Sequence, residues 1–451
     1  MFDLANFTPW TLFSDTGIIC GLLLVGKFLR VKIRLIQKLF IPPSLLAGLL
    51  GLLLGPNGLG WLPLSGSIST YAAILIAVVF GALPLSSPGF KVREVVHRVG
   101  PMWVFSQFGM LFQWGLMGLF GLLVLRAFWP GLNAAFGVML PTGFYGGHGT
   151  AAAIGSAFEG LGWDEAASLG MTTATIGVIV AILGGLLFIK IAAKKGQTSY
   201  ITDFRDLPDE YRSGLLPEEK REPTAVGTTS PISIDSHVFH LSLVILAAFG
   251  GYLMSKGVKM LAPKLELPVF SCAFVVGMLV KMLFNKAGAA TYIDPKTTSS
   301  ISSSATDLLV ACGVASIKLG VVVKYALPLV VLTLVGIAVT AFTVFYFGRR
   351  LNRKDWFEKS VFAWGWWTGT MAMGIALLRI VDPKMQSKAM DDYALAYLPC
   401  APVEILLITF VPICFAGGQG LWLMLGCLVV SLLLLLLAGR MKWWIPENKR
   451  K

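Results

Sequence analysis

Residues 141–150 read Pro-Thr-Gly-Phe-Tyr-Gly-Gly-His-Gly-Thr and interrupt a strongly apolar part of the chain. In a bilayer every backbone polar group needs a partner, so broken backbone at membrane depth persists only where protein or a water-filled cavity surrounds it. Breaks of this kind are typical of ion and substrate sites in secondary transporters. A second break follows in the other half of the chain, at Trp366-Trp367-Thr368-Gly369-Thr370. Two matching breaks in one apolar chain favour a transporter.

Composition places the chain in a bilayer. It is 56% hydrophobic and only 14% charged, and several apolar runs have the length that a span needs, which is roughly 20 residues. The net charge of +13 does not indicate a nucleic-acid partner, because the basic residues flank the apolar runs, as the positive-inside rule expects. The first residues carry no basic n-region, so we expect no cleavable signal peptide and a first span that inserts itself.

The apolar runs predict eleven spans, five in each half of the chain and one more at the end. A polar linker at 196–235 separates the halves, and each half contains one broken segment, at 133–157 and at 358–380. The predicted spans are 14–35, 42–56, 67–86, 99–126 and 165–191, then 236–256, 267–285, 303–320, 325–348 and 388–416, and finally 421–440.

Charge counting orients these spans. The first 16 residues have no Lys or Arg and are expected outside, whereas the basic tail after the last span is expected inside. The basic loops fall on the inner side only if the segment 133–157 enters and leaves the membrane from the outer side, and the segment 358–380 from the inner side. Both broken segments are therefore predicted to be re-entrant. The loop that carries Lys256, Lys259 and Lys264 departs from the rule, because it is predicted to lie outside.

Short matches between the halves support an internal repeat. Ile41-Pro42 aligns with Leu267-Pro268, and Gly149-Thr150 aligns with Gly369-Thr370, in the same order and at similar spacing. An odd number of spans in the first half inverts the second half. The predicted fold is an all-α integral membrane protein with two inverted repeats of five transmembrane helices, each with a re-entrant segment, plus one extra C-terminal helix. The predicted parts are a first repeat at 1–195, a cytoplasmic linker at 196–235, a second repeat at 236–416, and an extra helix with a basic tail at 417–451.

The first break has the chemistry of a binding site. Glycine lets the backbone turn and expose its polar groups; carbonyls suit Na⁺, and amides at a helix N-terminus suit a carboxylate. Thr142 and Thr150 add hydroxyl oxygens, and His148 could bind a carboxylate, relay a proton or bond to a neighbouring helix. Alternatively, the glycines serve only close helix packing.

Three further residues carry polar groups into two predicted spans. Thr172 and Thr175 share one face of a helix, although a membrane threonine often bonds its own backbone. Glu404 lies well inside the span 388–416, where an ionisable group is costly and is usually functional or paired. It could neutralise Na⁺, carry a proton, or form an ion pair with Arg379 or Lys384.

The motifs resemble those of the bacterial glutamate:sodium symporter family. The run Gly-Gly-His-Gly-Thr-Ala-Ala at 146–152 is similar to that family's first signature, and 174–177, Ile41-Pro42 and Leu267-Pro268 are similar to further motifs. The resemblance implies two inverted five-span units, Na⁺-coupled uptake of an acidic amino acid and a homodimer, with residues 146–150 lining the site. The second signature departs from the family pattern, because indoles stand at Trp366 and Trp367 in place of small residues.

We therefore expect a sodium-coupled symporter of glutamate or a related organic anion, in the inner membrane of a bacterium and not an enzyme. A proton-coupled carrier of another organic anion is the alternative. A membrane-embedded enzyme with His148 as base is a further rival, against which the absence of a catalytic motif counts. A passive channel is another, and it would need no coupling-ion site. Sodium is expected at Gly147, Thr150 and Thr370. The residues expected to bind substrate or ions are Thr142, Gly146, Gly147, His148, Gly149, Thr150, Thr172, Thr175, Trp367, Thr368, Gly369, Thr370 and Glu404.

Overall fold

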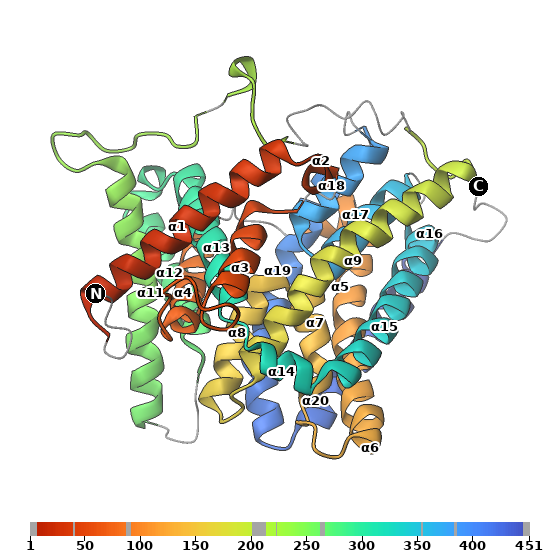
Figure 1. Ribbon diagram of the computed structural model, residues 1–451. Coiled ribbons are helices and arrows are strands. Elements are labelled where there is room, and N and C mark those ends of the chain that lie inside the picture. The colour runs from red at the N-terminus through yellow and green to blue at the C-terminus, as the bar shows by residue number, and fades with distance from the viewer. Residues whose placement is uncertain are drawn as a thin grey trace. The chain divides into compact units, whose positions relative to one another are not determined.

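The computed structural model of the chain consists of helices joined by loops (Figure 1). It describes residues 7–38, 41–86, 92–200, 213–221, 223–261, 267–352, 355–382 and 386–444. No strand occurs in these ranges, and nine of their helices are long and apolar enough to cross a membrane. The expectation of an all-α, multi-pass membrane protein is confirmed.

Two of the eleven predicted spans do not meet the criteria for a membrane-crossing helix, each for a different reason. The helix α3 (Pro43–Leu54) is apolar but has only 12 residues. The helix α13 (Pro295–Ala315) is long enough, but its first half is rich in serine and threonine. It begins well before the predicted start at 303, because the Asp294 carboxylate caps it and accepts hydrogen bonds from the Lys296 and Thr297 amides. Eleven crossings therefore remain a prediction.

The helices group into two compact units, and each unit takes helices from both halves of the chain. The boundaries of these units therefore do not follow the order of the chain. The first unit contains most of α1 (Pro9–Lys32), α3, α4 (Ile68–Ser86), α11 (Ser236–Leu261), α12 (Val269–Lys286) and α13. The second contains α5 (Val92–Leu119), α7 (Met139–Phe144), α8 (Gly147–Gly160), α9 (Ala166–Lys194), α14 (Leu319–Lys324), α15 (Ala326–Phe342), α17 (Trp356–Thr368), α18 (Met371–Val381), α19 (Ala389–Ala416) and α20 (Gly420–Arg440).

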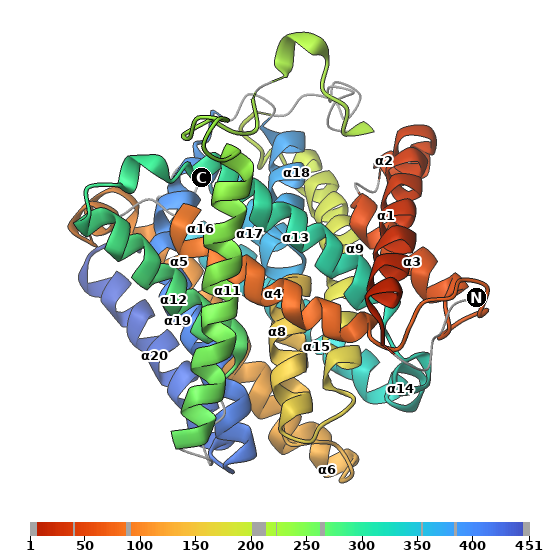
Figure 2. The same ribbon diagram turned by 90° about the vertical axis from the view of Figure 1, so that its left-hand side faces the viewer.

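The first unit is held together by close helix packing. Its helices α4, α11 and α12 contact one another, and α13 packs on α3 and α4 (Figure 2). Gly251 of α11 lies against Ala273 of α12, and Gly277 lies against the carbonyl of Gly81, so that a larger residue at either glycine would overlap its neighbour. Small residues thus allow the close approach on which packing within a bilayer depends.

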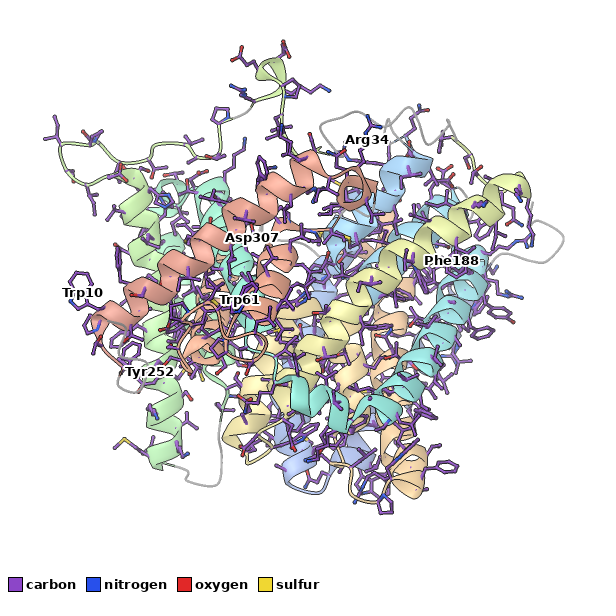
Figure 3. All side chains as sticks on the ribbon, viewed as in Figure 1. Trp10, Arg34, Trp61, Phe188, Tyr252 and Asp307 are labelled. Atoms are coloured by element: carbon purple, nitrogen blue, oxygen red, sulfur yellow. The ribbon has the colours of Figure 1, made fainter. Side chains whose placement is uncertain are left out.

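One buried carboxylate in the first unit was not anticipated from the sequence. Asp15 of α1 is 1% exposed and accepts hydrogen bonds from the Ser65 amide, the Ser65 hydroxyl and the Tyr71 hydroxyl. Three donors satisfy a charge that would otherwise be very costly inside a membrane protein. They attach the loop after α3 to α1. Trp10 on α1 and Trp61 in that loop expose their indoles, as aromatic residues at a membrane interface do (Figure 3).

The second unit contains two helix pairs, each interrupted by a short break. The first pair is α7 and α8, the second is α17 and α18, and all four helices contact α9 (Figure 1). Two other helices in this unit share an unusual ending. A π-helical segment at Phe120–Leu125 follows α5, and another at Thr343–Phe347 follows α15. Such segments are rare and often occur at functional sites.

Candidate functional site

The first break lies between α7 and α8 and depends on one glycine. Gly147 has φ of +63°, a left-handed backbone conformation that residues with a side chain rarely adopt. A Cβ at this position would also lie 3.1 Å from the carbonyl oxygen of Gly369, so there is little room for a side chain at Gly147. The chain turns here, and the first amides of α8 face the break.

The second break lies between α17 and α18 and consists of two non-helical residues, of which only Thr370 is extended. Gly369 has φ and ψ of −141° and −94°, and Thr370 has −146° and 162°. The Thr370 hydroxyl accepts a hydrogen bond from the Met373 amide at 3.4 Å and caps α18. The carbonyl end of one helix and the amide end of the next therefore lie two residues apart.

The two breaks meet beside α9. Gly147 lies against the Gly369 carbonyl and the Thr370 methyl group, and the Thr368 carbonyl lies against Gly177 of α9. The amide ends of α8 and α18 carry partial positive charge, and the carboxyl end of α17 carries partial negative charge. The meeting point therefore offers amides that suit a carboxylate and carbonyl oxygens that suit a hard cation.

His148 is joined to α9 across the first break. It is 4% exposed, and its Nε2 lies 3.3 Å from Oγ1 of Thr175. The sequence placed both residues in the site, and the structure brings them together. Which of the two groups donates the proton follows the tautomer of the imidazole.

Three other candidate threonines bond within their own helices. The hydroxyls of Thr142, Thr172 and Thr368 donate to the carbonyls of Val138, Ser168 and Trp364, four residues earlier in each case. These hydroxyls already have acceptors, although their lone pairs remain. Thr150 is buried beside Gly146, and Gly149 is half-buried, both in the first turn of α8.

The two neighbouring tryptophans of the second break share Tyr145 as a neighbour but otherwise pack against different residues. Trp367 is 1% exposed, lies with its ring tilted at 4.8 Å from the Phe105 ring, and covers Gly109 of α5. Its carbonyl accepts a hydrogen bond from Gln113 at 3.3 Å. Trp366 instead lies 4.7 Å from the Tyr145 ring and 4.2 Å from the Tyr393 ring.

Glu404 is half-buried on α19, and Tyr397 is its hydrogen-bond partner. The Tyr397 hydroxyl donates to Oε2 of Glu404 at 2.8 Å. Lys384, one of the basic partners considered from the sequence, lies outside the described residues. Sequence reasoning missed Tyr393 and Tyr397, although positions 393, 397 and 404 are spaced by four and seven residues and so share one helix face.

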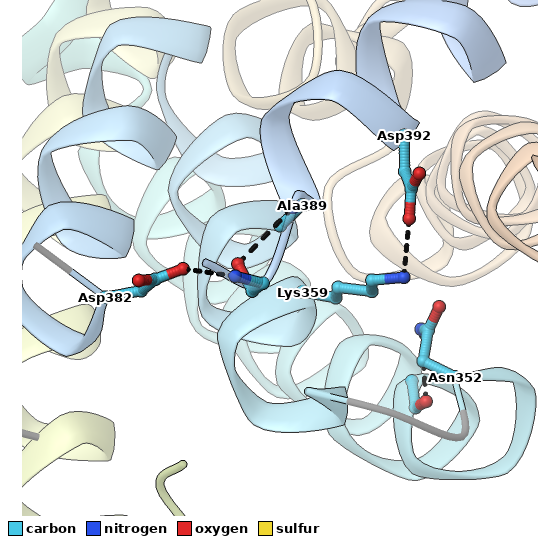
Figure 4. A network of polar contacts seen from close by, with 7 residues as sticks. Asn352, Lys359, Asp382, Ala389 and Asp392 are labelled. Carbon is cyan, nitrogen blue, oxygen red and sulfur yellow. Dashed lines mark hydrogen bonds and ion pairs between the residues drawn. The ribbon is translucent and has the colours of Figure 1, made fainter. Parts of the chain in front are cut away.

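Charged groups tie the α17–α18 pair to its neighbours (Figure 4). Nζ of Lys359 on α17 lies 2.8 Å from Oδ2 of Asp392 on α19. Asp382, at the end of α18, accepts hydrogen bonds from the Gln386 and Ser387 amides. The buried carboxylate of Glu358, in the first turn of α17, accepts one from the Ser199 amide at 2.6 Å. These contacts hold the ends of the pair in place while its break lies against α9.

A further ion pair joins the start of α9 to α14. Nζ of Lys324 lies 2.9 Å from Oε1 of Glu165, which also accepts a hydrogen bond from the Tyr325 hydroxyl. The hydrogen bond from Lys324 lowers the pKa of Glu165 below its ordinary value. In the described residues no group of three or more His, Cys, Asp or Glu side chains could hold a metal ion.

Long apolar helices, broken pairs and a polar meeting point together define a multi-pass membrane protein of the transporter class. The sodium/glutamate symporter family model matches residues 12–374, so the chain belongs to that family. The resemblance seen in the sequence is therefore confirmed. The match covers the first break and the second, and it ends within α18. No curated protein matches the chain.

Proposed function

We propose that the protein is a secondary active symporter that couples Na⁺ entry to uptake of an acidic amino acid, glutamate or a close relative. The observation that carries this proposal is the meeting of two broken helices at Gly147 and Gly369 beside α9. Membership of the sodium/glutamate symporter family supports it. Transport proceeds by alternating access, in which the two breaks open in turn to the two sides of the membrane.

Groups of opposite polarity in the site bind the two ligands. Amides at the starts of α8 and α18, with His148 and Thr175, bind the substrate carboxylates. Oxygen atoms at Gly147, Thr150 and Thr370, together with the carbonyl end of α17, bind Na⁺, which takes hard oxygen ligands. The remaining candidates, Gly146, Gly149, Thr142, Thr172, Trp367, Thr368 and Gly369, shape the backbone around these groups, and Glu404 supplies a negative charge.

The architecture of this proposal is an inverted repeat with two re-entrant segments, 133–157 from outside and 358–380 from inside. The order of helices supports it, because α1, α3, α4 and α5 are followed by a broken pair and α9, and α11, α12, α13 and α15 by a broken pair and α19. The π-helical endings of α5 and α15 fall at the same place in this order. The N-terminus lies outside, the C-terminus lies in the cytoplasm of a bacterium, and the protein is a homodimer.

Uptake into proteoliposomes tests the proposal. An inward Na⁺ gradient is expected to drive accumulation of labelled glutamate, and its replacement by K⁺ or choline is expected to abolish accumulation. A protonophore should leave the initial rate unchanged. Accumulation that instead follows a pH gradient without Na⁺ would establish the proton-coupled alternative, and equilibration without accumulation would indicate a channel.

A further inference from the structure

An aromatic cluster lies next to the first break in the second unit. Tyr145 ends the turn after α7, and its ring is 4.7 Å from that of Trp366. The Trp366 ring is 4.2 Å from Tyr393 and 5.8 Å from Tyr397, and the two tyrosines are 5.6 Å apart. We call Tyr145, Trp366, Tyr393 and Tyr397, with the carboxylate of Glu404, the aromatic cage. Three separate parts of the chain contribute to it.

The cage contains a hydroxyl that has no hydrogen-bond partner among the described residues. Tyr393 is 1% exposed, and its hydroxyl makes no hydrogen bond to the described residues. The hydroxyls of Tyr145 and Tyr397 are bonded, to the Ser106 carbonyl and to Glu404. Burying a hydroxyl without a partner costs free energy. A polar ligand at this place would supply the missing bond.

The cage presents groups that carry negative charge or negative electrostatic potential. Glu404 contributes a carboxylate, and the rings contribute negative π faces. Pro399 and Pro402 lie inside α19 between Tyr397 and Glu404 and have no N–H, so they cannot bond the carbonyls four residues earlier, at 395 and 398. Such a set of groups attracts a cation that carries several N–H donors and repels a carboxylate.

We infer that the aromatic cage binds the α-ammonium group of the substrate, an inference that rests on the proposed function. An acidic amino acid carries one ammonium and two carboxylates, and the amide ends of α8 and α18 suit only the carboxylates. Tyr145 directly precedes Gly146, so the cage adjoins the break that holds those amides. Aromatic faces together with a carboxylate are a known way to hold an ammonium group.

The two tryptophans have different roles in this proposal. Trp366 contacts all three tyrosines of the cage, whereas Trp367 approaches only Tyr145, at 6.1 Å, and packs on Phe105 and Gly109 of α5. Trp366 is therefore the indole that contacts the substrate, and Trp367 is a packing residue. Of the cage residues, Tyr397 and Glu404 are partly exposed, whereas Tyr145, Trp366 and Tyr393 are buried.

The substrate pair glutamate and glutarate isolates the ammonium group, because glutarate has both carboxylates and no ammonium. Competition for Na⁺-driven uptake in proteoliposomes gives the ratio of the two affinities. The wild-type protein is expected to prefer glutamate by roughly tenfold or more, the scale set by a buried charged pair. In E404Q, glutamate affinity should fall until the ratio approaches one, while glutarate affinity stays the same. The amide still accepts the Tyr397 hydrogen bond, so folding should be preserved.

Two further variants keep the test decisive. Y393F removes a hydroxyl that bonds none of the residues that the structure describes, so the thermal midpoint should stay unchanged while the glutamate preference falls by a few-fold. D307N removes an exposed carboxylate from α13 in the first unit (Figure 3) and should change neither quantity.

The outcomes separate the cage from the function on which it rests. A wild-type ratio in both E404Q and Y393F would overturn the cage. Equal loss of both substrates in E404Q, with a raised Na⁺ requirement, would overturn it too and make Glu404 a sodium ligand. Absence of Na⁺-driven uptake of either compound by the wild-type protein would overturn the proposed function itself.

Discussion

The two breaks of the second unit occupy corresponding places in the chain, yet they are built differently. The first turns through a left-handed glycine, Gly147, and begins α8 with small residues. The second breaks at Gly369, which is neither helical nor extended, and at the extended Thr370, and it is preceded by two indoles that pack mainly against different residues. The first break exposes backbone amides, and the second adds carbonyl oxygens and aromatic surface. Two broken helix pairs in one unit can thus offer opposite kinds of ligand.

The largest expected effect is at the left-handed glycine of the first break. G147A forces a side chain into an unfavourable φ, which costs about 1 kcal/mol, and brings its Cβ to 3.1 Å from the Gly369 carbonyl. We expect uptake to be lost while the protein still reaches the membrane in normal amount, and we expect the same of G147V and G149V.

The matched control for this variant is G196A. Gly196 has φ of +62°, nearly that of Gly147, but a Cβ there would meet nothing within 4 Å. The G196A variant therefore introduces the same backbone strain, but at a position outside the break. If G196A lost as much uptake as G147A, backbone strain alone would explain the effect, and the contact between the breaks would not matter.

The next effect distinguishes the two indoles of the second break. W367A empties the space over Gly109 and Phe105, and a buried aromatic truncation costs about 3–5 kcal/mol of unfolding free energy. We therefore expect W367A to lower the thermal midpoint clearly. W366A should lower it less and should broaden the range of amino acids accepted, measured by competition for uptake. A larger loss of stability in W366A and a broader substrate range in W367A would contradict this assignment.

The smallest effect concerns a surface ion pair at the start of α9, the helix that both breaks share. Because the pKa of Glu165 is lowered by Lys324, the carboxylate is more easily ionised in the folded protein. Its contribution to stability is complete above its unfolded pKa and is lost as the pH falls through the folded pKa. E165Q should be slightly less stable than the wild type at neutral pH, and the two thermal midpoints should converge in acid. A difference that grew in acid would contradict the lowered pKa.

Much of the fold could be predicted from the sequence because apolar runs and glycine breaks act locally. The start of α13 was missed because the polar stretch 295–302 looks unlike a membrane span, and only the cap at Asp294 reveals where the helix begins. The grouping into two units depends on packing between distant segments, which no local pattern specifies.

The residues of the candidate site could be predicted only in part, because some of their contacts depend on packing between distant segments. His148 and Thr175 were both named, but their hydrogen bond joins two helices and could not be inferred from spacing. The shared face of Tyr393, Tyr397 and Glu404 could have been recognised from the helical period. The position of Trp366 against that face could not have been recognised from the sequence, because it depends on how α17 packs.

The most direct test of the account is the side of the membrane from which each broken pair is reached. In a cysteine-free background, single cysteines at Pro130, Gly160 and Gln386, all exposed positions, can be labelled with an impermeant thiol reagent. We predict that positions 130 and 160 label from outside and that position 386, just after the second pair, labels from inside. Labelling of 130 and 160 from opposite faces would show that the first segment crosses the membrane and would contradict the inverted repeat.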